Sequence, residues 1–534
     1  MASEQEVLDY IIIGSGFGGS VSALRLAEKG YSVLVLEQGK RWRPEDFPST
    51  NWNLRKFIWM PRLLLHGIQQ ITLLRDVLVF HGAGVGGGSL VYANTLLVPP
   101  DPFFEDEKWR DLADWKQALA PHYATAKRML GVTEAAHLAE TDEHLRAVAQ
   151  EMGRGETFHR TNVGVFFGEP GKTVPDPFFG GEGPERTGCT LCGGCMVGCK
   201  PGAKNTLDKN YLYLAEKKGA RILPETRVRD IRPVAGGYEL SVERSTSLIF
   251  KERRTLRARN VVVSAGVLGT VKLLMACRDR GSLPGLPRAL GAYVRTNSEA
   301  LLAVKSRSSS VDYSKGIAIS AGFYPDEKTH IEACRYPAGS DFMALLGTTL
   351  VGGGRLPRPL HFLGAILRRP FQALRLLWPF GWARRTVILL CMQPVDNSLE
   401  LRMRRRWFWP FRRVLDSDRG DRPAAPTFIP IANETAERMA KRMNGMPQSV
   451  LPEVLLDTCS TAHILGGCAI GHGPEDGVVD SSCRVFGHEG LYVIDGSVIP
   501  ANLGVNPSLT ITALAEHAMS RVPAKTATVR PSST

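Results

Sequence analysis

The first forty residues constrain the fold of this chain more than any other stretch. Residues 9–14 form the apolar run DYIIIG, residues 22–30 form the alanine-rich run SALRLAEKG, and YSVLVLEQG follows at residues 31–39. Strand, glycine turn, helix and second strand in this order predict a βαβ unit with buried parallel strands. Gly30 ends the helix, as a glycine just past the last turn commonly does. We therefore predict an α/β fold that begins with a Rossmann-like unit.

Three glycines, Gly14, Gly16 and Gly19, form the pattern GxGxxG between the predicted strand and helix, and Glu37 ends the second strand. Glycine lets the backbone turn tightly and approach a pyrophosphate at the helix N-terminus, while an acid at this distance accepts hydrogen bonds from ribose hydroxyls. This context predicts a dinucleotide site, with an ordinary glycine turn as the alternative. The pattern alone does not distinguish FAD from NAD.

A second glycine-rich loop, HGAGVGGGSLVYAN, occupies residues 81–94. Its unhindered N–H groups suit a phosphate or a planar ring, whereas a flexible surface loop is the alternative. The candidate cofactor-binding residues of this loop are Gly84, Gly86, Gly87, Gly88 and Ser89.

The chain has 534 residues, 43% hydrophobic and 22% charged, which suits a large two-domain enzyme. We predict a discontinuous nucleotide-binding domain formed by residues 1–99, 200–299 and 456–534. Residues 100–199 and 300–455 are predicted to form a second, α+β substrate domain. Acids near the start argue against a signal peptide, and no apolar run is long enough for a spanning helix. We expect a cytoplasmic protein, with peripheral membrane contact as an option.

A series of ordered motifs extends the pattern along the chain. GSGFGG and GAGVGGGSLVYAN are followed by VVVSAGVLGTVKLL, HILGGCAIG and DGSVIPANLGVNPSLTITALAEHA. Together they resemble the signatures of the glucose-methanol-choline (GMC) oxidoreductases, especially the cholesterol oxidase branch, over Asp9 to about Ala518. The resemblance implies FAD in a Rossmann-like domain of the GMC and glutathione-reductase type. Further FAD-contacting residues that it implies are Asn94, Val228, Ser264, Ala265, Gly266, Asp495, Gly496 and Asn506.

The same resemblance implies a catalytic pair, His463 and Asn506. Alcohol oxidation by hydride transfer needs one group to take the hydroxyl proton and another to hold the oxygen. His463 is the natural acid/base because its charge changes near neutral pH, and Asn506 would orient the alcohol. Members of this branch also carry a glutamate in the substrate domain. Glu332 in THIEACRY is a possible match, but a solvated strand acid is the alternative, so steroid isomerisation stays open.

Four cysteines, Cys189, Cys192, Cys195 and Cys199, form C-x2-C-x2-C-x3-C before Lys200 and Pro201. This spacing resembles the ligand run of bacterial ferredoxins and predicts a 4Fe-4S cluster. A zinc site and reduced structural cysteines are the alternatives. A single cluster would need a remote fourth ligand from among Cys277, Cys334, Cys391, Cys459, Cys468 and Cys483.

The positive charge of the chain is partly local. The chain has 66 Lys and Arg against 53 Asp and Glu, and residues 355–395 carry seven Arg and no acid, interleaved with Trp, Phe and Leu. This mixture predicts a segment that contacts an anionic membrane surface through arginines such as Arg368, Arg369 and Arg375. A packed helical pair with a solvated basic rim is the alternative. No nucleic-acid module accompanies the charge, so nucleic acid is not an expected partner.

The sequence thus predicts an FAD-dependent oxidoreductase that oxidises the CH–OH group of a hydrophobic alcohol. A 3-hydroxysteroid such as cholesterol, or a long-chain alcohol, is the expected substrate, and oxygen or another acceptor takes the electrons. One alternative is a dehydrogenase that passes electrons through a cysteine-bound iron-sulfur cluster. The other is a flavin-bearing, membrane-associated binding protein without turnover.

Overall fold

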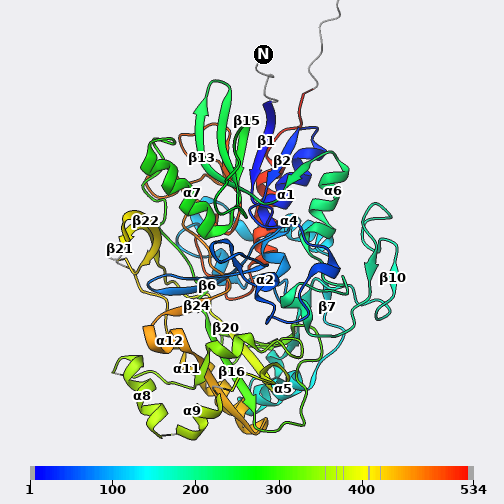
Figure 1. Ribbon diagram of the computed structural model, residues 1–534, viewed down its shortest axis with the longest axis vertical. Coiled ribbons are helices and arrows are strands. Elements are labelled where there is room, and N and C mark those ends of the chain that lie inside the picture. Colours follow the sequence, from blue (N-terminus) through cyan, green and yellow to red (C-terminus); the bar gives the residue numbers. More distant parts are fainter. Residues whose placement is uncertain are drawn as a thin grey trace, which may run out of the picture.

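The computed structural model describes residues 7–526 apart from residues 355, 369, 377, 407, 408 and 421. Arg369 of the predicted membrane-contact segment lies outside the described residues. The described chain is organised around two seven-stranded sheets, one above the other in the view of Figure 1. The mixed α/β class predicted from the sequence is confirmed.

The first sheet contains the predicted βαβ unit. Its order is β12-β2-β1-β15-β14-β13, and β25 pairs with the end of β15. Neighbouring strands β12, β2, β1 and β15 run parallel, as does β25 beside β15, whereas β13 and β14 form an antiparallel meander. The strands are β1 (Val7–Ile13), β2 (Val33–Leu36), β12 (Arg221–Leu223), β13 (Thr226–Val234), β14 (Gly237–Arg244), β15 (Arg253–Val263) and β25 (Leu491–Val493). Helix α1 (Phe17–Glu28) follows β1 directly, so its N-terminus lies at the strand's carboxyl end.

The second sheet is antiparallel throughout, in the order β19-β23-β16-β20-β18-β17-β8. The strands are β8 (His159–Arg160), β16 (Ala300–Ser306), β17 (Ile319–Phe323), β18 (His330–Cys334), β19 (Gly347–Thr349), β20 (Thr386–Met392) and β23 (Gly445–Val450). One face packs against α5 (Glu140–Glu151) and α11 (Pro430–Arg442). The opposite face carries Cys334, Leu390 and Met392, which pack with Ala93 and Met196. That face is therefore turned toward the second glycine loop.

Shorter elements connect the two sheets. Further helices are α2 (Leu54–Phe57), α3 (Asp101–Phe104), α4 (Trp115–Met129), α6 (Tyr211–Lys217), α7 (Gly266–Arg280), α8 (Arg358–Arg368), α9 (Pro370–Leu376), α10 (Trp382–Arg385), α12 (Leu451–Leu456) and α13 (Ser508–Ser520). Further strands are β3 (Trp59–Met60), β4 (Leu65–His66), β5 (Gln69–Leu73), β6 (Val77–Gly82), β7 (Thr133–Glu134), β9 (Asn162–Val163), β10 (Thr173–Val174), β11 (Arg186–Thr187), β21 (Glu400–Arg406), β22 (Trp409–Asp418) and β24 (Cys459–Thr461). In the described part of the chain, no helix is long and apolar enough to cross a membrane.

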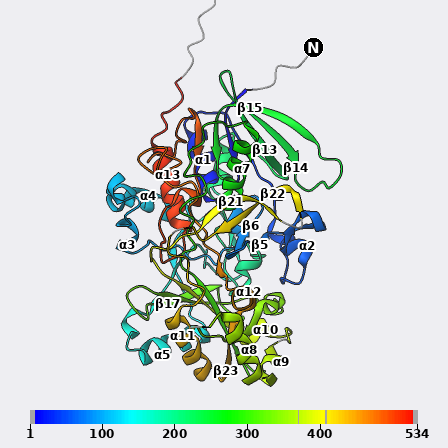
Figure 2. The ribbon, with the colours of Figure 1, turned by 90° about the vertical axis from the view of Figure 1, so that its left-hand side faces the viewer.

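Two segments assigned to the second domain from the sequence pack with the core of the first sheet. Helix α4 lies beside α13 (Figure 2), and the Tyr123 hydroxyl is 2.9 Å from that of Thr510. Strands β21 and β22 form a two-stranded sheet, and their Leu401 and Leu415 side chains join the same core. The predicted domain boundaries stay a prediction, and these contacts favour assigning both segments to the first domain.

A buried ion pair fixes α5 to the second sheet. The Arg335 guanidinium donates to Asp142 at 2.8 Å, and neither side chain has any exposed surface. Asp142 also accepts from the Ser320 hydroxyl at 2.6 Å and from the backbone N–H of Ala139 at 2.7 Å. A buried charge that loses its partner is costly, whereas an exposed pair contributes little.

We expect Asp142→Ala to lower the apparent free energy of unfolding by about 3–5 kcal/mol, because Arg335 would keep a buried, unpaired charge. Glu143→Ala is the matched control on the same helix. Glu143 pairs with Arg146 at 2.9 Å on the surface, and its loss should cost less than about 1 kcal/mol. Urea titration measures both values, and equal losses would contradict the assignment.

Candidate active site

His463 is held in place by a carboxylate that lies just before β16. Its Nδ1 contacts Oε1 of Glu299, whose side chain is fully buried. The other Glu299 oxygen accepts from the backbone N–H of Ala462 at 2.8 Å. Burial lowers the pKa of His463, but the charge and hydrogen bond of Glu299 outweigh this effect, so the net pKa is raised. The imidazolium form of His463 is therefore favoured.

Glu332 and Asn506 meet across the two halves of the chain. Glu332 lies in β18 and has no exposed surface, while Asn506 directly precedes Pro507 and α13. The Asn506 amide donates to Glu332 Oε2 at 3.1 Å. Burial raises the pKa of Glu332 to about 7, against the lowering effects of this hydrogen bond and of the His463 charge. The solvated strand acid considered for Glu332 is thus wrong, because β18 is an interior strand of the sheet.

An apolar surface surrounds the Glu332 carboxyl group. In the register of β18, β20 and β16, Glu332 lies opposite Leu390, which in turn lies opposite Leu301. Residues opposite one another share a face of a sheet, so these side chains line the face turned toward the glycine loop. Oε1 of Glu332 and Oδ1 of Asn506 are buried without a hydrogen-bond partner in the described chain. Two oxygen atoms with unused hydrogen-bonding capacity, surrounded by apolar side chains, suit a mainly apolar ligand with one polar group.

Asn506 owes its position to a second asparagine, Asn297. The Asn297 side chain accepts from the backbone N–H groups of Leu503 and Gly504 at 3.0 and 2.8 Å and donates to the Val505 carbonyl at 3.0 Å. Three consecutive peptide groups are therefore fixed directly before Asn506. Asn297 itself has a φ of 59°, a left-handed conformation that asparagine tolerates well.

The two glycine loops contact each other at the start of α1. A Cβ at Gly14 would lie 2.2 Å from the Ser264 carbonyl oxygen, and one at Gly19 would lie 2.1 Å from the Gly14 carbonyl oxygen. A Cβ at Gly87 would lie 2.6 Å from Cα of Gly16. Gly16, in contrast, has open space where its Cβ would be. The first and third glycines of the pattern thus serve packing, and the middle one leaves room for a ligand.

Glu37 ties three loops together. Its carboxylate accepts from the Ser15 hydroxyl at 2.7 Å, from the Gly39 N–H at 2.8 Å and from the Gly84 N–H at 3.4 Å. Burial raises its pKa despite these hydrogen bonds. The predicted role of Glu37 toward a ribose is untested, and the structure gives it a further role in positioning both glycine loops.

The other predicted cofactor residues lie at the carboxyl end of the first sheet. Asp495 accepts from the Gly266 N–H at 2.9 Å and from the Thr270 hydroxyl at 2.6 Å. Ser264 donates to the Ile494 carbonyl at 2.5 Å. The remaining residues of this group are Ala265 as N-cap of α7, Gly496 in the turn after Asp495, Val228 beside a bulge in β13, and Gly86 and Ser89 in the second glycine loop. Gly84 and Gly88 lie in that loop too.

A buried lysine joins the second glycine loop to the cysteine segment. Lys204 donates to the carbonyls of Leu90 and Cys195 at 2.9 and 2.6 Å. Burial lowers its pKa to about 8. Asn94, at the end of the glycine loop, is fully buried and has a φ of 73°. Its side chain interacts with the Cys195 sulfur, and neither of its polar atoms makes a hydrogen bond to nitrogen or oxygen within the described chain.

The four cysteines do not converge on a metal site. Cys195 and Cys199 are buried, Cys189 is half-buried and Cys192 is exposed. The Cys199 sulfur accepts from the Lys204 N–H at 3.3 Å and the Cys189 sulfur from the Leu191 N–H at 3.4 Å. Among the described residues, no three Cys, His, Asp or Glu side chains gather to hold a metal ion. The arrangement therefore does not support the predicted 4Fe-4S cluster, nor zinc.

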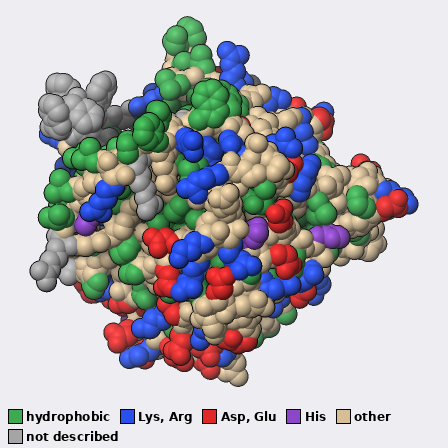
Figure 3. All heavy atoms as spheres, turned by 90° about the horizontal axis from the view of Figure 1, so that it is seen from below, with side chains coloured by type: hydrophobic (Ala, Val, Ile, Leu, Met, Phe, Trp, Pro, Cys, Tyr) green, Lys and Arg blue, Asp and Glu red, His purple; other side chains and the backbone are tan. Residues whose placement is uncertain are grey.

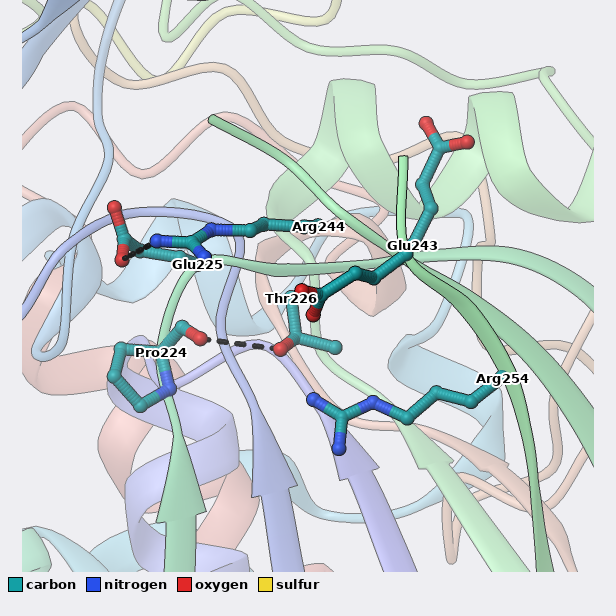
Figure 4. A pocket seen from close by; sticks show the side chains of 7 residues that line it. Pro224, Glu225, Thr226, Glu243, Arg244 and Arg254 are labelled. Carbon is teal, nitrogen blue, oxygen red and sulfur yellow. Dashed lines mark hydrogen bonds and ion pairs between the residues drawn. The ribbon is translucent and has the colours of Figure 1, made fainter. Parts of the chain in front are cut away.

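A separate polar pocket lies at the end of the β13–β15 meander (Figure 4). There Arg244 lies 3.6 Å from Glu225, and the Thr226 hydroxyl donates to the Pro224 carbonyl at 3.1 Å. The Thr226 N–H also donates to the backbone carbonyl of Glu37 at 2.8 Å. This pocket is thus on the nucleotide side of the sheet, and neither His463 nor Glu332 lines it.

The sequence analysis predicted His463 and Asn506 as a catalytic pair but did not identify the residues that position them. Glu299 and Asn297 lie directly before β16, in the run RTNSEALL, which matches no motif identified in the sequence. Their partners lie more than 160 residues away. Only the fold brings these positions together, so no local pattern could have revealed them.

Comparison with known proteins places these features in a family. Models described as GMC oxidoreductase match residues 184–277 and 398–515, and an NAD(P)-binding Rossmann-like domain matches residues 12–43. A cholesterol oxidase of Acinetobacter baumannii is 51% identical over 97% of this chain and 94% of the relative. A cholesterol oxidase of Mycobacterium tuberculosis is 48% identical over 98% and 92%.

Solved structures agree with this assignment at the level of the fold. Pyridoxine 4-oxidase superposes with a TM-score of 0.63 at 16% identity, covering 96% of this chain and 99% of the other. Formate oxidase superposes with a TM-score of 0.62 at 15% identity, covering 97% and 98%. With near-full-length relatives at about half identity, the chain belongs to the GMC oxidoreductase family.

Proposed function

We propose that this protein is an FAD-dependent oxidase of hydrophobic alcohols, with 3-hydroxysteroids as the substrate class and oxygen as the electron acceptor. The observation that carries the proposal is the meeting of Glu332 and Asn506, within electrostatic reach of His463, on an apolar sheet face. The two relatives described as cholesterol oxidases support the substrate class. A long-chain-alcohol oxidase of Arabidopsis thaliana, 24% identical over 96% of this chain, is compatible with the broader class.

The residues of the first sheet fit FAD. Gly16 leaves open space at the N-terminus of α1, where a pyrophosphate binds in Rossmann-like folds. Asn94 presents a buried amide from the second glycine loop, next to Cys195. Asp495 and Gly266 lie where the parallel strands of the first sheet end. The bound flavin would supply the hydride acceptor that alcohol oxidation requires.

Three side chains divide the work on the alcohol. The raised pKa of His463 favours the cation, which would donate a hydrogen bond to the substrate oxygen and stabilise its developing negative charge. Glu332, with a pKa of about 7, would accept the hydroxyl proton. Asn506 donates to Glu332 and keeps its own carbonyl oxygen free to orient the hydroxyl group. The proton acceptor is thus Glu332, where the sequence alone had suggested His463.

The same glutamate suits steroid isomerisation. A ketone formed beside a ring double bond has acidic hydrogens on the carbon between them, and a carboxylate can move such a proton from one carbon to the next. Glu332 is buried among apolar side chains, and its Oε1 carries no hydrogen-bond partner within the described residues. We therefore include isomerisation of the ketone in the proposed activity.

Direct transfer of electrons to oxygen is the proposed route for reoxidation. The alternative route through a cysteine-bound cluster requires ligands that converge, and the four cysteine side chains do not do so within the described chain. We propose instead that Cys195 and Cys199 pack the loop that Lys204 ties to the second glycine loop. No observation favours the non-catalytic alternative.

Helices α8 and α9 are the proposed membrane-contact surface. Leu363, Leu367, Phe371 and Leu374 follow a helical repeat, and their exposed fractions are 55, 72, 80 and 65%. Apolar side chains of this size are rarely exposed together on a monomer. Figure 3, which views this end of the molecule, shows hydrophobic and basic side chains next to one another. Exposed Arg368 and Arg375 flank the apolar side chains and suit anionic headgroups.

Replacement of the proton acceptor should slow the chemical step. We expect Glu332→Gln to reduce the rate of flavin reduction by a steroid alcohol about 10²- to 10⁴-fold. In the unaltered protein the rate should rise with pH up to about 7, the pKa of Glu332, because only the carboxylate accepts a proton. This rise should vanish in the variant. Anaerobic stopped-flow measurement over a pH series tests it.

Glu453→Gln serves as the control for that measurement. Glu453 is a second buried carboxyl group, whose pKa burial raises to about 8. Its loss should leave the rise below pH 7 in place. A Glu332→Gln protein that keeps the full rate and the same pH profile would remove Glu332 from the proposed chemistry.

Space for the cofactor can be tested at the middle glycine of the first loop. A Cβ at Gly16 meets no protein atom within 4 Å, so Gly16→Ala should leave the apoprotein as stable as before. It should weaken FAD binding by about tenfold or more, because one lost phosphate contact of about 1.4 kcal/mol gives that factor. Gly473→Ala also meets no atom within 4 Å and should change neither property. Unaltered FAD affinity in Gly16→Ala would contradict the assignment.

The proposed membrane surface can be tested with matched double variants. We expect Leu367→Glu with Phe371→Glu to abolish cosedimentation with anionic liposomes and to slow turnover of membrane-borne sterol. Turnover of a short soluble alcohol should not change. The control is Ile249→Glu with Phe250→Glu, a similarly exposed pair in the loop between β14 and β15 of the first sheet. Equal liposome binding by both double variants would contradict the proposal.

A further inference from the structure

His330 is a buried histidine without a conventional hydrogen bond. It begins β18 with 1% of its surface exposed, and neither ring nitrogen has a hydrogen-bond partner among the described residues. A buried polar group without a partner is costly, so its presence calls for an explanation. His330 lies two residues before Glu332, and alternate residues of a strand share a face. The imidazole is therefore on the same sheet face as the proposed proton acceptor.

The pairing of β18, β17 and β8 shows which residues lie between Glu332 and the edge of the sheet. Gly322 of β17 lies opposite Glu332 on one side and opposite His159 of β8 on the other. Because Gly322 has no side chain, a gap separates Glu332 from His159. A Cβ at Gly322 would lie 2.6 Å from Nε2 of His330 and 3.4 Å from Cγ of Glu332. The His330 ring thus fills this gap beside the stem of Glu332.

Two further rings continue the row toward solvent. The His330 ring stacks on His159 with centroids 5.2 Å apart and on Tyr324 with centroids 4.6 Å apart. His159 and Tyr324 are partly exposed. His159 Nδ1 is 2.9 Å from the Thr157 carbonyl oxygen. Because a carbonyl oxygen can only accept a hydrogen bond, Nδ1 carries the proton. In the neutral form of His159, Nε2 is therefore a proton acceptor. The Glu332 carboxyl group, the buried His330 ring and the partly exposed His159 ring therefore lie in a row that leads toward the protein surface.

We propose that His330 and His159 form the route by which the proton taken up by Glu332 reaches bulk water. The inference rests on the proposed function, in which the alcohol carbon loses a hydride to the flavin and its hydroxyl loses a proton to Glu332. No solvent reaches the Glu332 side chain directly, yet it must release this proton before the next turnover. Reduction of oxygen to hydrogen peroxide consumes one proton, so the same route returns it.

Each step of the route moves one proton, and no group is oxidised or reduced. Glu332 gives its proton to an imidazole nitrogen of His330. Because these two groups make no hydrogen bond to each other in the described chain, a water molecule carries the proton between them. The His330 cation gives a proton to Nε2 of His159, which releases one to solvent. Burial and the neighbouring His159 hold the pKa of His330 well below its ordinary value, so the proton does not stay there. Tyr324 is the other titratable group facing the ring, and burial keeps its hydroxyl protonated by raising its pKa to about 12.

The experiment measures two signals in one anaerobic stopped-flow mixing with a steroid alcohol in weak buffer. Flavin absorbance reports reduction, and a pH-indicator dye reports proton release. In the unaltered protein both signals should change together. In His330→Phe, which keeps a stacked ring but lacks both nitrogens, reduction in the first turnover should stay within about twofold while proton release lags by about tenfold or more. A merely structural role of His330 would not separate the two signals.

Two further variants keep the test decisive. Gly322→Ala should give the same lag by pushing against His330, which covers the case that His330→Phe does not fold. His122→Phe is the control, because His122 contacts His517 at the same centroid distance of 5.2 Å but lies on α4, which packs beside α13 and not on the second sheet. Proton release in step with reduction in both His330→Phe and Gly322→Ala would overturn the relay. If Glu332→Gln reduces its flavin at the normal rate, the proposed role of Glu332 itself fails, and this outcome is distinct from the failure of the relay.

Discussion

The hydrogen bond between Asn506 and Glu332 is the contact on which the site depends. It joins β18, an interior strand of the second sheet, to the segment directly before α13, which packs with the first sheet. A carboxyl group without exposed surface is costly to bury, and a single amide donor offsets only part of that cost. The two halves must therefore stay in register for Glu332 to keep its partner, and Asn297 fixes the backbone that carries Asn506.

The nucleotide side of the molecule depends on close backbone contact instead of polar pairing. Gly14 and Gly87 allow backbones to approach within distances that a side chain would prevent, whereas Gly16 keeps its space free. Glu37 then holds both loops through N–H groups of Ser15, Gly39 and Gly84. One half of this cradle is local in sequence, since strand, turn and helix follow one another without interruption, and the second glycine loop supplies the other half.

Prediction from sequence succeeded where structure is local and failed where it depends on register. The βαβ unit and the glycine loops follow from neighbouring residues. The role of Glu332 stayed open because HIEAC has no signal that places it in an interior strand whose apolar face is turned toward the second glycine loop. The cysteine spacing suggested ligands, yet within the described residues no three such side chains gather to hold a metal ion. Glu299 and Asn297 were invisible, because only the fold brings their partners near.

His463 and Glu332 both have a raised pKa, but the main cause differs: the charge and hydrogen bond of Glu299 for His463, and burial for Glu332. Glu299 contacts His463 and raises its pKa, and the same negative charge disfavours ionisation of Glu332. With Glu299 committed to the imidazole, Glu332 has no cation in direct contact and relies on Asn506. The site thus favours the charged form of a histidine that can donate a hydrogen bond and leaves a glutamate poised near neutrality as a proton acceptor. Groups whose surroundings shift their pKa values mark acid and base roles, and here Glu299 sets the shift of His463 while burial sets that of Glu332.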